Sequence, residues 1–131
     1  MREAQTINAL PVWQSTADSH KDSACIVTEW ELVTVEIDGQ DNHFVLGTVI
    51  SDYKQRWATG DYVFTSKVKD LDLETGLVMT RNSLYCLSGD GQEVFPTLVE
   101  TAKMKMTGQP LGVIRGIEKQ GFKFSGTIDG S

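Results

Sequence analysis

The sequence predicts a mainly β, α+β domain: a small curled antiparallel sheet, or a barrel of the SH3 or OB type, with one covering helix near the C-terminus. Segments rich in β-branched and aromatic residues recur at short spacing, and Gly, Asn and Asp turns separate them. Only residues 96–107 show helical periodicity. The length of 131 residues suits one β-rich core, which we place at residues 25–110.

Residues 1–24 form a polar N-terminal arm that we expect to be partly flexible. Residues 15–23 (STADSHKDS) have the composition of a loop. Leaving a Trp side chain in water is unfavourable because its apolar surface is large. We therefore expect a short segment around residues 8–13 to dock Trp13 on the core.

The start of the core predicts an antiparallel hairpin. Residues 26–37 (IVTEWELVTVEI) are rich in β-branched side chains, and residues 43–51 (HFVLGTVIS) form a second strand. The turn at Asp38-Gly39 joins them. Gly47, inside the second strand, predicts a bulge or a close approach of another part of the chain.

Further short strands are expected at residues 62–68, 77–80 and 84–87, separated by polar turns. Alternation puts Tyr62, Phe64 and Val68 on one face, which we expect to point inward. Strand signals this closely spaced favour a sheet that is strongly curled or closed into a barrel.

The expected helix begins at Pro96 or Thr97 and ends before Gly108. Apolar residues recur along it at three- and four-residue steps, and we expect this stripe to cover the sheet. The stripe consists of Leu98, Val99, Ala102 and Met106. Residues 111–131 are Gly-rich and predict a C-terminal hairpin or an extended arm.

The chain is acidic, with a formal net charge of −6, which opposes general binding of nucleic acid because phosphate backbones repel it. The charge is uneven. Residues 1–60 carry four basic and nine acidic side chains, whereas residues 103–123 carry five basic and one acidic. The basic segment predicts contact with an acidic partner or with a second copy, and hence a possible homo-oligomer. The alternative is a solvated helix end and tail.

The sequence offers no membrane span, since no apolar run approaches the roughly 18 residues that a span needs. With no leader pattern at its start, the chain is expected to be cytoplasmic and to have no membrane partner. Cys25 and Cys86 are expected to be buried free thiols.

Catalytic and cofactor motifs are missing from the sequence. It contains no GxSxG, no HExxH and no GxxxxGK[ST] phosphate loop. Its two histidines, His20 and His43, have no Cys or His at metal-ligand spacing. We therefore expect no enzyme, no cofactor and no metal.

One concentration of aromatic, Arg and polar residues is a candidate binding surface, because Trp, Tyr and Arg supply most binding hot spots. The candidate residues are Asp52, Tyr53, Arg56, Trp57, Arg81, Asn82 and Tyr85. A purely structural role is the alternative: Arg56 pairs with Asp52 or Asp61. In that case Trp57 covers the core and Asn82 shapes a turn.

Residues 60–66 have the pattern GDYVxTS, and residues 76–89 have the pattern GxVxTxNSxYxLxG. Together they resemble a family of small uncharacterised proteins from proteobacteria, phages and other mobile elements. The resemblance spans about residues 45–90. Because that family has no established activity, the resemblance implies no site residues. It implies a bacterial, cytoplasmic context and a mobile-gene origin.

Three functions follow as hypotheses. The first is a non-enzymatic interaction module that binds a protein partner or itself. The second is an acidic inhibitor or decoy of a host defence or nucleic-acid enzyme, with a row of carboxylates at Glu29, Glu31, Glu36, Asp38 and Asp41. The third is an OB- or SH3-like nucleic-acid-binding domain. In it Tyr62, Phe64 and Tyr85 would stack on bases and Arg56, Lys67 and Arg81 would follow the backbone.

Overall fold

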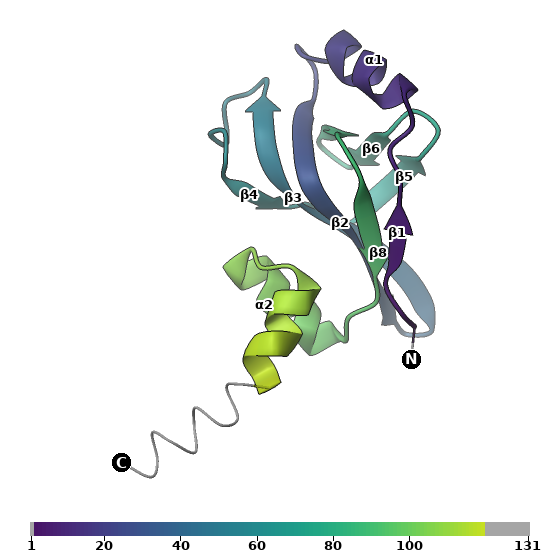
Figure 1. Cartoon of the computed structure of the whole chain (residues 1–131), viewed down its shortest axis with the longest axis vertical. Coiled ribbons are helices and arrows are strands. Elements are labelled where there is room, and N and C mark those ends of the chain that lie inside the picture. Colours follow the sequence, from purple (N-terminus) through teal and green to yellow (C-terminus); the bar gives the residue numbers. More distant parts are fainter. Residues whose placement is uncertain (1, 120–131) are drawn as a thin grey trace.

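A computed structural model describes residues 2–119 (Figure 1). The elements in chain order are β1 (Gln5–Ile7), α1 (Val12–Ser19), β2 (Cys25–Ile37), β3 (Gln40–Asp52), β4 (Tyr62–Phe64), β5 (Val68–Asp72), β6 (Leu77–Thr80), β7 (Leu84–Leu87), β8 (Gly91–Val94) and α2 (Leu98–Thr107). Residues 111–119 are also helical. The mainly β class, with a helix near the C-terminus, is confirmed.

The strands between residues 2 and 119 form one open, mixed sheet rather than a closed barrel. Its order is β1-β8-β2-β7-β6-β5, with β3 paired to β2 and to β4. The β2–β3 hairpin is antiparallel as expected, and positive φ angles at Asp38 and Gly39 form its tight turn. The expectation of a purely antiparallel sheet is wrong, because β7 and β8 both run parallel to β2.

Strand β2 is divided by an irregularity near its middle. The register with β3 shifts between Thr28 and Glu31, and Glu29 has a φ of +49°. Before the shift, residues 25–27 pair with β7, and after it residues 31–33 pair with β8. The same edge of β2 therefore pairs with β7 along its first part and with β8 along its second part. The sheet bends between these two parts.

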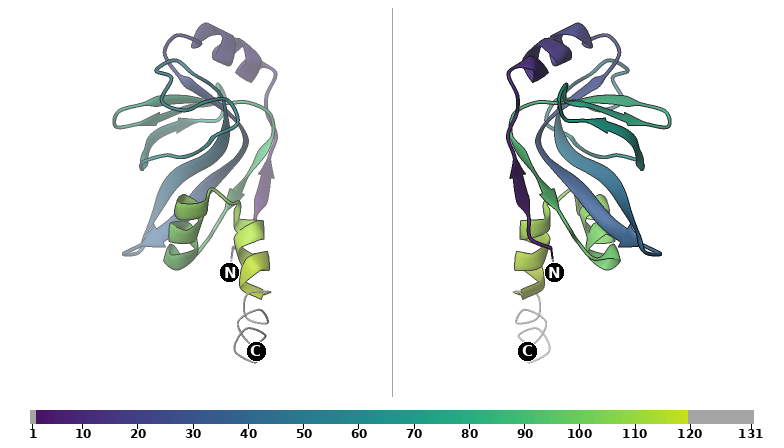
Figure 2. Two further views of the ribbon diagram at one scale, coloured as in Figure 1. Left: turned by 90° about the vertical axis from the view of Figure 1, so that its left-hand side faces the viewer. Right: turned by 90° about the vertical axis from the view of Figure 1, so that its right-hand side faces the viewer.

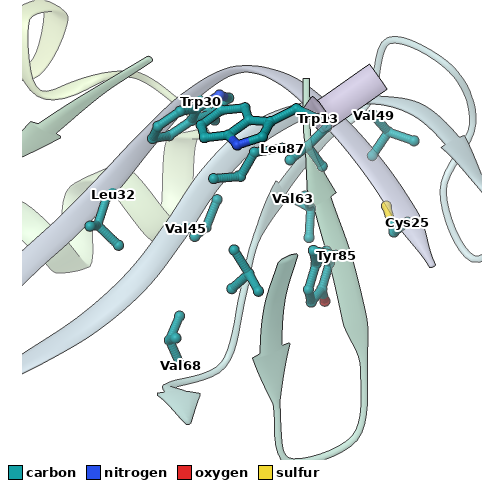
Figure 3. Close-up of a cluster of buried hydrophobic side chains, with 12 residues drawn as sticks. Trp13, Cys25, Trp30, Leu32, Val45, Val49, Val63, Val68, Tyr85 and Leu87 are labelled. Atoms are coloured by element: carbon teal, nitrogen blue, oxygen red, sulfur yellow. The ribbon is translucent and has the colours of Figure 1, made fainter. Parts of the chain in front are cut away.

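The N-terminal arm is built into the sheet. Strand β1 pairs with β8. Helix α1 takes in residues 15–19 of the segment expected to be a loop, and residues 20–23 form a turn. The predicted docking of Trp13 is confirmed, since its side chain is 2% exposed and its indole N–H donates to the Leu73 carbonyl at 2.8 Å. Its ring lies 5.9 Å from the ring of Trp30 (Figure 3).

Apolar side chains pack on both faces of the long strands, because the sheet is covered on both. One cluster gathers Trp13, Trp30, Val45, Leu87 and their neighbours between α1 and the curled sheet (Figure 3). A second lies between the sheet and the C-terminal helices. Its buried members are Val33, Leu46, Val94, Met104, Leu111 and Ile114.

The expected inward face of β4 is reversed. Val63 is buried in the first cluster, whereas the Tyr62 side chain is largely exposed. The Tyr62 hydroxyl donates to the carbonyl of Lys105 at 3.2 Å, and Phe64 stacks on Phe44. Tyr62 and Phe64 share a face as expected, but that face turns toward α2 and not toward the main core. The predicted strand over residues 62–68 is two strands, β4 and β5, and Val68 is buried in the first cluster with Val63.

Helix α2 begins and ends as predicted, but the opposite face is buried. The buried residues are Glu100, Thr101 and Met104. Leu98, Val99 and Met106 are 59%, 65% and 80% exposed, and Ala102 is exposed too. The expectation that this apolar stripe covers the sheet is therefore wrong. We call Leu98, Val99, Ala102 and Met106 the outer face of α2.

Polar contacts account for the orientation of α2. Thr97 and Glu100 form a capping box, in which each side chain accepts a hydrogen bond from the other residue's backbone N–H. The Glu100 carboxylate also accepts hydrogen bonds from the Arg115 guanidinium at 2.9 and 3.2 Å. This network ties Glu100 to the following helix, so the apolar stripe is turned outward.

Residues 111–119 form a helix where we expected a hairpin or an arm over 111–131; residues 120–131 lie outside the described part of the chain. Leu111 and Ile114 are buried, and the Leu111 N–H donates to the Glu31 carboxylate at 3.0 Å. Figure 2 shows this helix beside α2, both at one end of the sheet. The predicted close approach at Gly47 is confirmed, since a Cβ there would lie 3.0 Å from that of Val27.

Candidate functional site

The loop after β3 is organised by an ion pair between Asp52 and Arg56. The Asp52 carboxylate accepts hydrogen bonds from the Arg56 backbone N–H at 2.8 Å, from its Nε at 3.1 Å and from its Nη2 at 3.0 Å. It also accepts one from the Lys54 N–H at 3.4 Å. The Asp52 side chain is fully buried, so this pair fixes the loop as a tight turn.

The same guanidinium links two loops. Its Nη1 donates to the Ser83 hydroxyl at 2.8 Å, in the turn between β6 and β7. It also lies 4.4 Å from the ring centroid of Trp57, which packs against the first core cluster. The structural alternative is therefore supported: Arg56 pairs with Asp52, Trp57 covers the core, and residues 80–83 form a turn closed by the Thr80 N–H and the Ser83 carbonyl.

Burial and charge determine the protonation of the ion pair. Burial alone would raise the pKa of Asp52, but the hydrogen bonds and charge of Arg56 outweigh it, and the pKa lies below its ordinary value. The hydrogen bond to Asp52 raises the pKa of Arg56. Both groups stay charged near neutral pH, so neither has the shifted pKa that a general acid or base needs.

Tyr85 and Cys25 are buried close to this pair, whereas Cys86 lies in a separate buried cluster. Tyr85 is 4% exposed, and burial raises its pKa. Burial also raises the pKa of the Cys25 thiol to about 12 and that of Cys86 to about 11. The prediction of buried free thiols is confirmed, and both remain protonated and poorly nucleophilic at neutral pH.

The seven predicted surface residues do not form one surface. Asp52, Arg56 and Trp57 are brought together, with Tyr85 buried below them. Tyr53 is exposed beside Lys54, and Arg81 and Asn82 are exposed at the β6–β7 turn. Arg81 lines a separate hollow with residues 66–69. Between residues 2 and 119, no cluster of His, Cys, Asp and Glu could hold a metal ion.

The surface that sequence reasoning missed is the outer face of α2. Its residues were noticed as an apolar stripe but were assigned to the core. A signal was available in the sequence: Thr97 is followed three residues later by Glu100, and this spacing predicts a capping box. The box directs the Glu100 side chain back to the start of the helix. Arg115, fifteen positions further on, completes the network, and that contact leaves no local signal.

Charged side chains lie at both ends of α2. Lys105 is exposed in its last turn. Before its start, Glu36 shares a hollow of about 340 Å³ with Phe95, Pro96 and Arg2, whose guanidinium is paired with Asp41. Asp38 is exposed at the β2–β3 turn. Within residues 2–119, Lys105, Glu36 and Asp38 form no ion pair. The helix thus has Lys105 at its C-terminal end and Glu36 beside the residues that precede its N-terminal end.

These observations define a β-rich domain in which the Asp52–Arg56 ion pair joins two loops. The outer face of α2 is apolar and exposed. The chain belongs to the family described as a domain of unknown function, DUF6957, whose model matches residues 3–103. The match includes every strand of the described sheet and ends inside α2. No curated protein and no solved structure matches the chain.

Among residues 2–119, no helix has both the length and the apolar character needed to cross a membrane.

Proposed function

We propose that the chain is a small non-enzymatic interaction module that binds a second copy of itself through the outer face of α2. The exposure of Leu98, Val99 and Met106 carries this proposal. A helix that buries Glu100 and Thr101 while it exposes three large apolar side chains is unfavourable in an isolated monomer. Apolar patches of this kind mark surfaces that another protein covers.

Charge complementarity favours a second copy as the occupant. Two α2 helices packed antiparallel about a two-fold axis bring the C-terminal end of each against the N-terminal end of the other. Lys105 of one copy then approaches Glu36 and Asp38 of the second copy, and the reverse contact forms at the other end. Antiparallel packing also places the two helix dipoles in a favourable arrangement. The apolar residues meet in the centre, with charged pairs at the rim.

The other two hypotheses have less support. Of the proposed carboxylate row, Glu31 is buried against the Leu111 N–H, and Asp41 is paired with Arg2 at 3.0 Å. Of the proposed base-stacking residues, Tyr85 is buried and Phe64 is stacked on Phe44. The five proposed carboxylates therefore do not form one exposed row, and of the three proposed stacking residues only Tyr62 is exposed.

A bacterial, cytoplasmic setting with a phage or mobile-element origin is part of the proposal. It is supported by the GDYVxTS and GxVxTxNSxYxLxG patterns alone. A self-associating module of this size fits such an origin because it needs no second gene product to form its interface.

Light scattering of the full chain at micromolar concentration tests the proposal. The wild-type mass is expected to be that of a dimer, 2 × 14.5 = 29 kDa. Met106→Glu places a carboxylate in the centre of the interface and is expected to give a monomer. Met79→Glu, at an exposed Met on β6, is the matched control and is expected to stay dimeric.

A monomeric wild type at all concentrations up to the millimolar range would contradict the proposal. Equal effects of the two substitutions would contradict the assignment of the interface to α2. Circular dichroism on each variant separates loss of association from loss of folding, because Met106 is 80% exposed and its replacement is not expected to unfold the chain.

A further inference from the structure

A second surface gathers positive charge on a chain that is acidic overall. A hollow of about 500 Å³ is lined by Ser66, Lys67, Val68, Lys69 and Arg81. Ser66 and Lys67 lie just before β5, Val68 and Lys69 are its first two residues, and Arg81 lies in the turn between β6 and β7. The three basic side chains are exposed, and within the described part of the chain none of them forms an ion pair.

Strand register brings these charges together. Val68 pairs with Thr80, which is the last pair of the two strands, and Lys67 and Arg81 are the residues just beyond it on each chain segment. Both line the same hollow. The register then shifts between Val68 and Asp70, which leaves Lys69 as the extra residue of a bulge. Like charges that line one hollow repel each other. An anion held between them would remove that repulsion.

Protection of the sheet edge does not account for the whole cluster. β5 is the last strand in the sheet order, and lysines and bulges on edge strands prevent pairing with other chains. That role explains Lys67 and Lys69. It does not require Arg81, which lies outside the edge strand and adds a third positive charge to the same hollow.

We infer that this hollow binds a compact phosphate group carrying two or more negative charges. An Arg guanidinium can hold two phosphate oxygens at once, Lys ammonium groups supply point charges, and the Ser66 hydroxyl is a further donor. The walls are Val68 and the aliphatic stems of the basic residues. The volume falls in the range of small-molecule sites, so an organic body can accompany the phosphates.

The charges around the hollow favour a compact ligand over a nucleic-acid strand. Asp70 and Asp72 follow on β5, and Glu74 lies in the next turn; all three are exposed. A long polyanion that crossed the hollow would meet these carboxylates, whereas a diphosphate would not. The bulge at Lys69 likewise opposes the addition of a peptide strand to the β5 edge.

Isothermal titration of the full chain at low salt tests the inference with three probes: inorganic pyrophosphate, adenosine diphosphate and a short single-stranded oligodeoxynucleotide. Both diphosphates are expected to bind with a Kd of about 1 mM or below. Arg81→Gln and Lys67→Gln are each expected to raise that Kd about tenfold, since each removes a charged hydrogen-bond donor. Lys54→Gln, an exposed Lys outside the hollow, is the control and should leave it unchanged.

Each outcome has a definite meaning. Tighter binding of adenosine diphosphate than of pyrophosphate supports an organic body in the hollow, and equal binding supports recognition of the phosphates alone. No binding of either diphosphate at about 10 mM overturns the inference, as does an equal loss with Lys54→Gln. Tighter binding of the oligonucleotide than of both diphosphates also overturns it and assigns the surface to nucleic acid.

A second measurement does not depend on identifying the natural ligand. Because the basic side chains that line the hollow repel each other without an anion, Lys67→Gln is expected to melt at the same temperature as wild type or above it. Adding pyrophosphate should raise the melting temperature of the wild type more than that of the variant. A variant that melts lower and responds equally to pyrophosphate would show that Lys67 only supports the fold.

Discussion

The carboxylate of Asp52 accepts four hydrogen bonds, three of them from a single residue four positions later. Such a carboxylate can be buried because the guanidinium of Arg56 replaces the water that it loses. Arg56 in turn contacts Ser83 and Trp57, so one side chain joins the β3–β4 loop to the β6–β7 turn. Removing it should affect stability and not a reaction.

Arg56→Gln leaves the buried Asp52 carboxylate with backbone donors only. We expect the free energy of unfolding at pH 7 to fall by about 2–4 kcal/mol, which urea denaturation measures. Because the folded pKa of Asp52 lies below its unfolded value of about 4, the stability gained from the pair is complete above that pH. It is lost as the pH falls through the folded pKa.

The difference between wild type and Arg56→Gln should therefore shrink in acid. Lys54→Gln, in the same loop but exposed, should change stability by no more than about 0.5 kcal/mol at either pH. An Arg56→Gln deficit of equal size at pH 7 and at about pH 3 would show that lost packing, rather than the ion pair, is responsible.

At the scale of single residues, the sequence predicts the contact between Asp52 and Arg56, but it does not predict the burial of the side chains around them. Asp52 and Arg56 stand four positions apart beside a predicted strand end, so their contact was foreseeable as one of two options. The burial of Tyr85 was not, because it depends on the parallel pairing of Cys25 with Tyr85, a contact across sixty positions. Local patterns contain no information on such a pairing.

The helices show what local patterns can determine. The beginning of α2 at the Thr97 cap and its end at Gly108, whose φ is +71°, were both predictable, because capping residues lie within the helix's own sequence. A side chain at position 108 would collide with the ring of Tyr62, so glycine is needed there for space as well. Which face turns inward depends on Glu100 and Arg115, and was predicted wrongly.

The helix over residues 111–119 lies beyond the end of the family match at residue 103, yet it closes the second core cluster. Ile114→Ala is expected to lower the free energy of unfolding by about 2–4 kcal/mol, because a buried side chain is lost beside Val33 and Met104. Val113→Ala, at the neighbouring exposed position, should cost less than about 1 kcal/mol. Thermal melting with denaturant titration gives both values.

Equal, small effects of the two alanine substitutions would mean that residues 111–119 do not dock on the sheet, as in the hairpin or arm that the sequence suggested. The sequence favoured that view because Gly112 and Gly116 weaken the helical signal. The contact with Glu31 opposes this weakness. A buried carboxylate at the first turn accepts the Leu111 N–H, and a negative charge is favourable at that end of a helix.

For the molecule as a whole, the sequence already shows that acidic residues dominate residues 1–60 and basic residues dominate residues 103–123. The structure shows where some of these charges lie relative to α2. Lys105 in the last turn of α2 and Glu36 beside Phe95 and Pro96 lie at opposite ends of one helix. Ten residues of helix span about 15 Å, which is long enough to keep the two charges apart within one copy. A two-fold axis brings them together between copies.

Exchanging these charges tests the arrangement. Lys105→Glu and Glu36→Lys are each expected to weaken the dimer, and the double variant is expected to recover much of the lost affinity, because the pairs form again with reversed sign. Sedimentation at several salt concentrations measures the dissociation constants. Salt should weaken the wild type and the double variant alike, since both depend on rim charges.

A double variant no stronger than the weaker single variant would exclude the antiparallel arrangement of α2. It would leave open a dimer held by the outer face in another orientation, and Met106→Glu would then still disrupt it. The two tests therefore separate the existence of the interface from its geometry.

Strand β2 has a consequence for synthesis on the ribosome. Its hairpin with β3 can close as soon as residue 52 has emerged, but its other edge has to wait for β7 and then for β8, which ends at Val94. Until 94 of the 131 residues are made, the nascent chain presents a long apolar strand with unpaired backbone groups. Binding of chaperones to the nascent chain and its aggregation should therefore be greatest in that interval. Both should decrease once β8 has paired with β2.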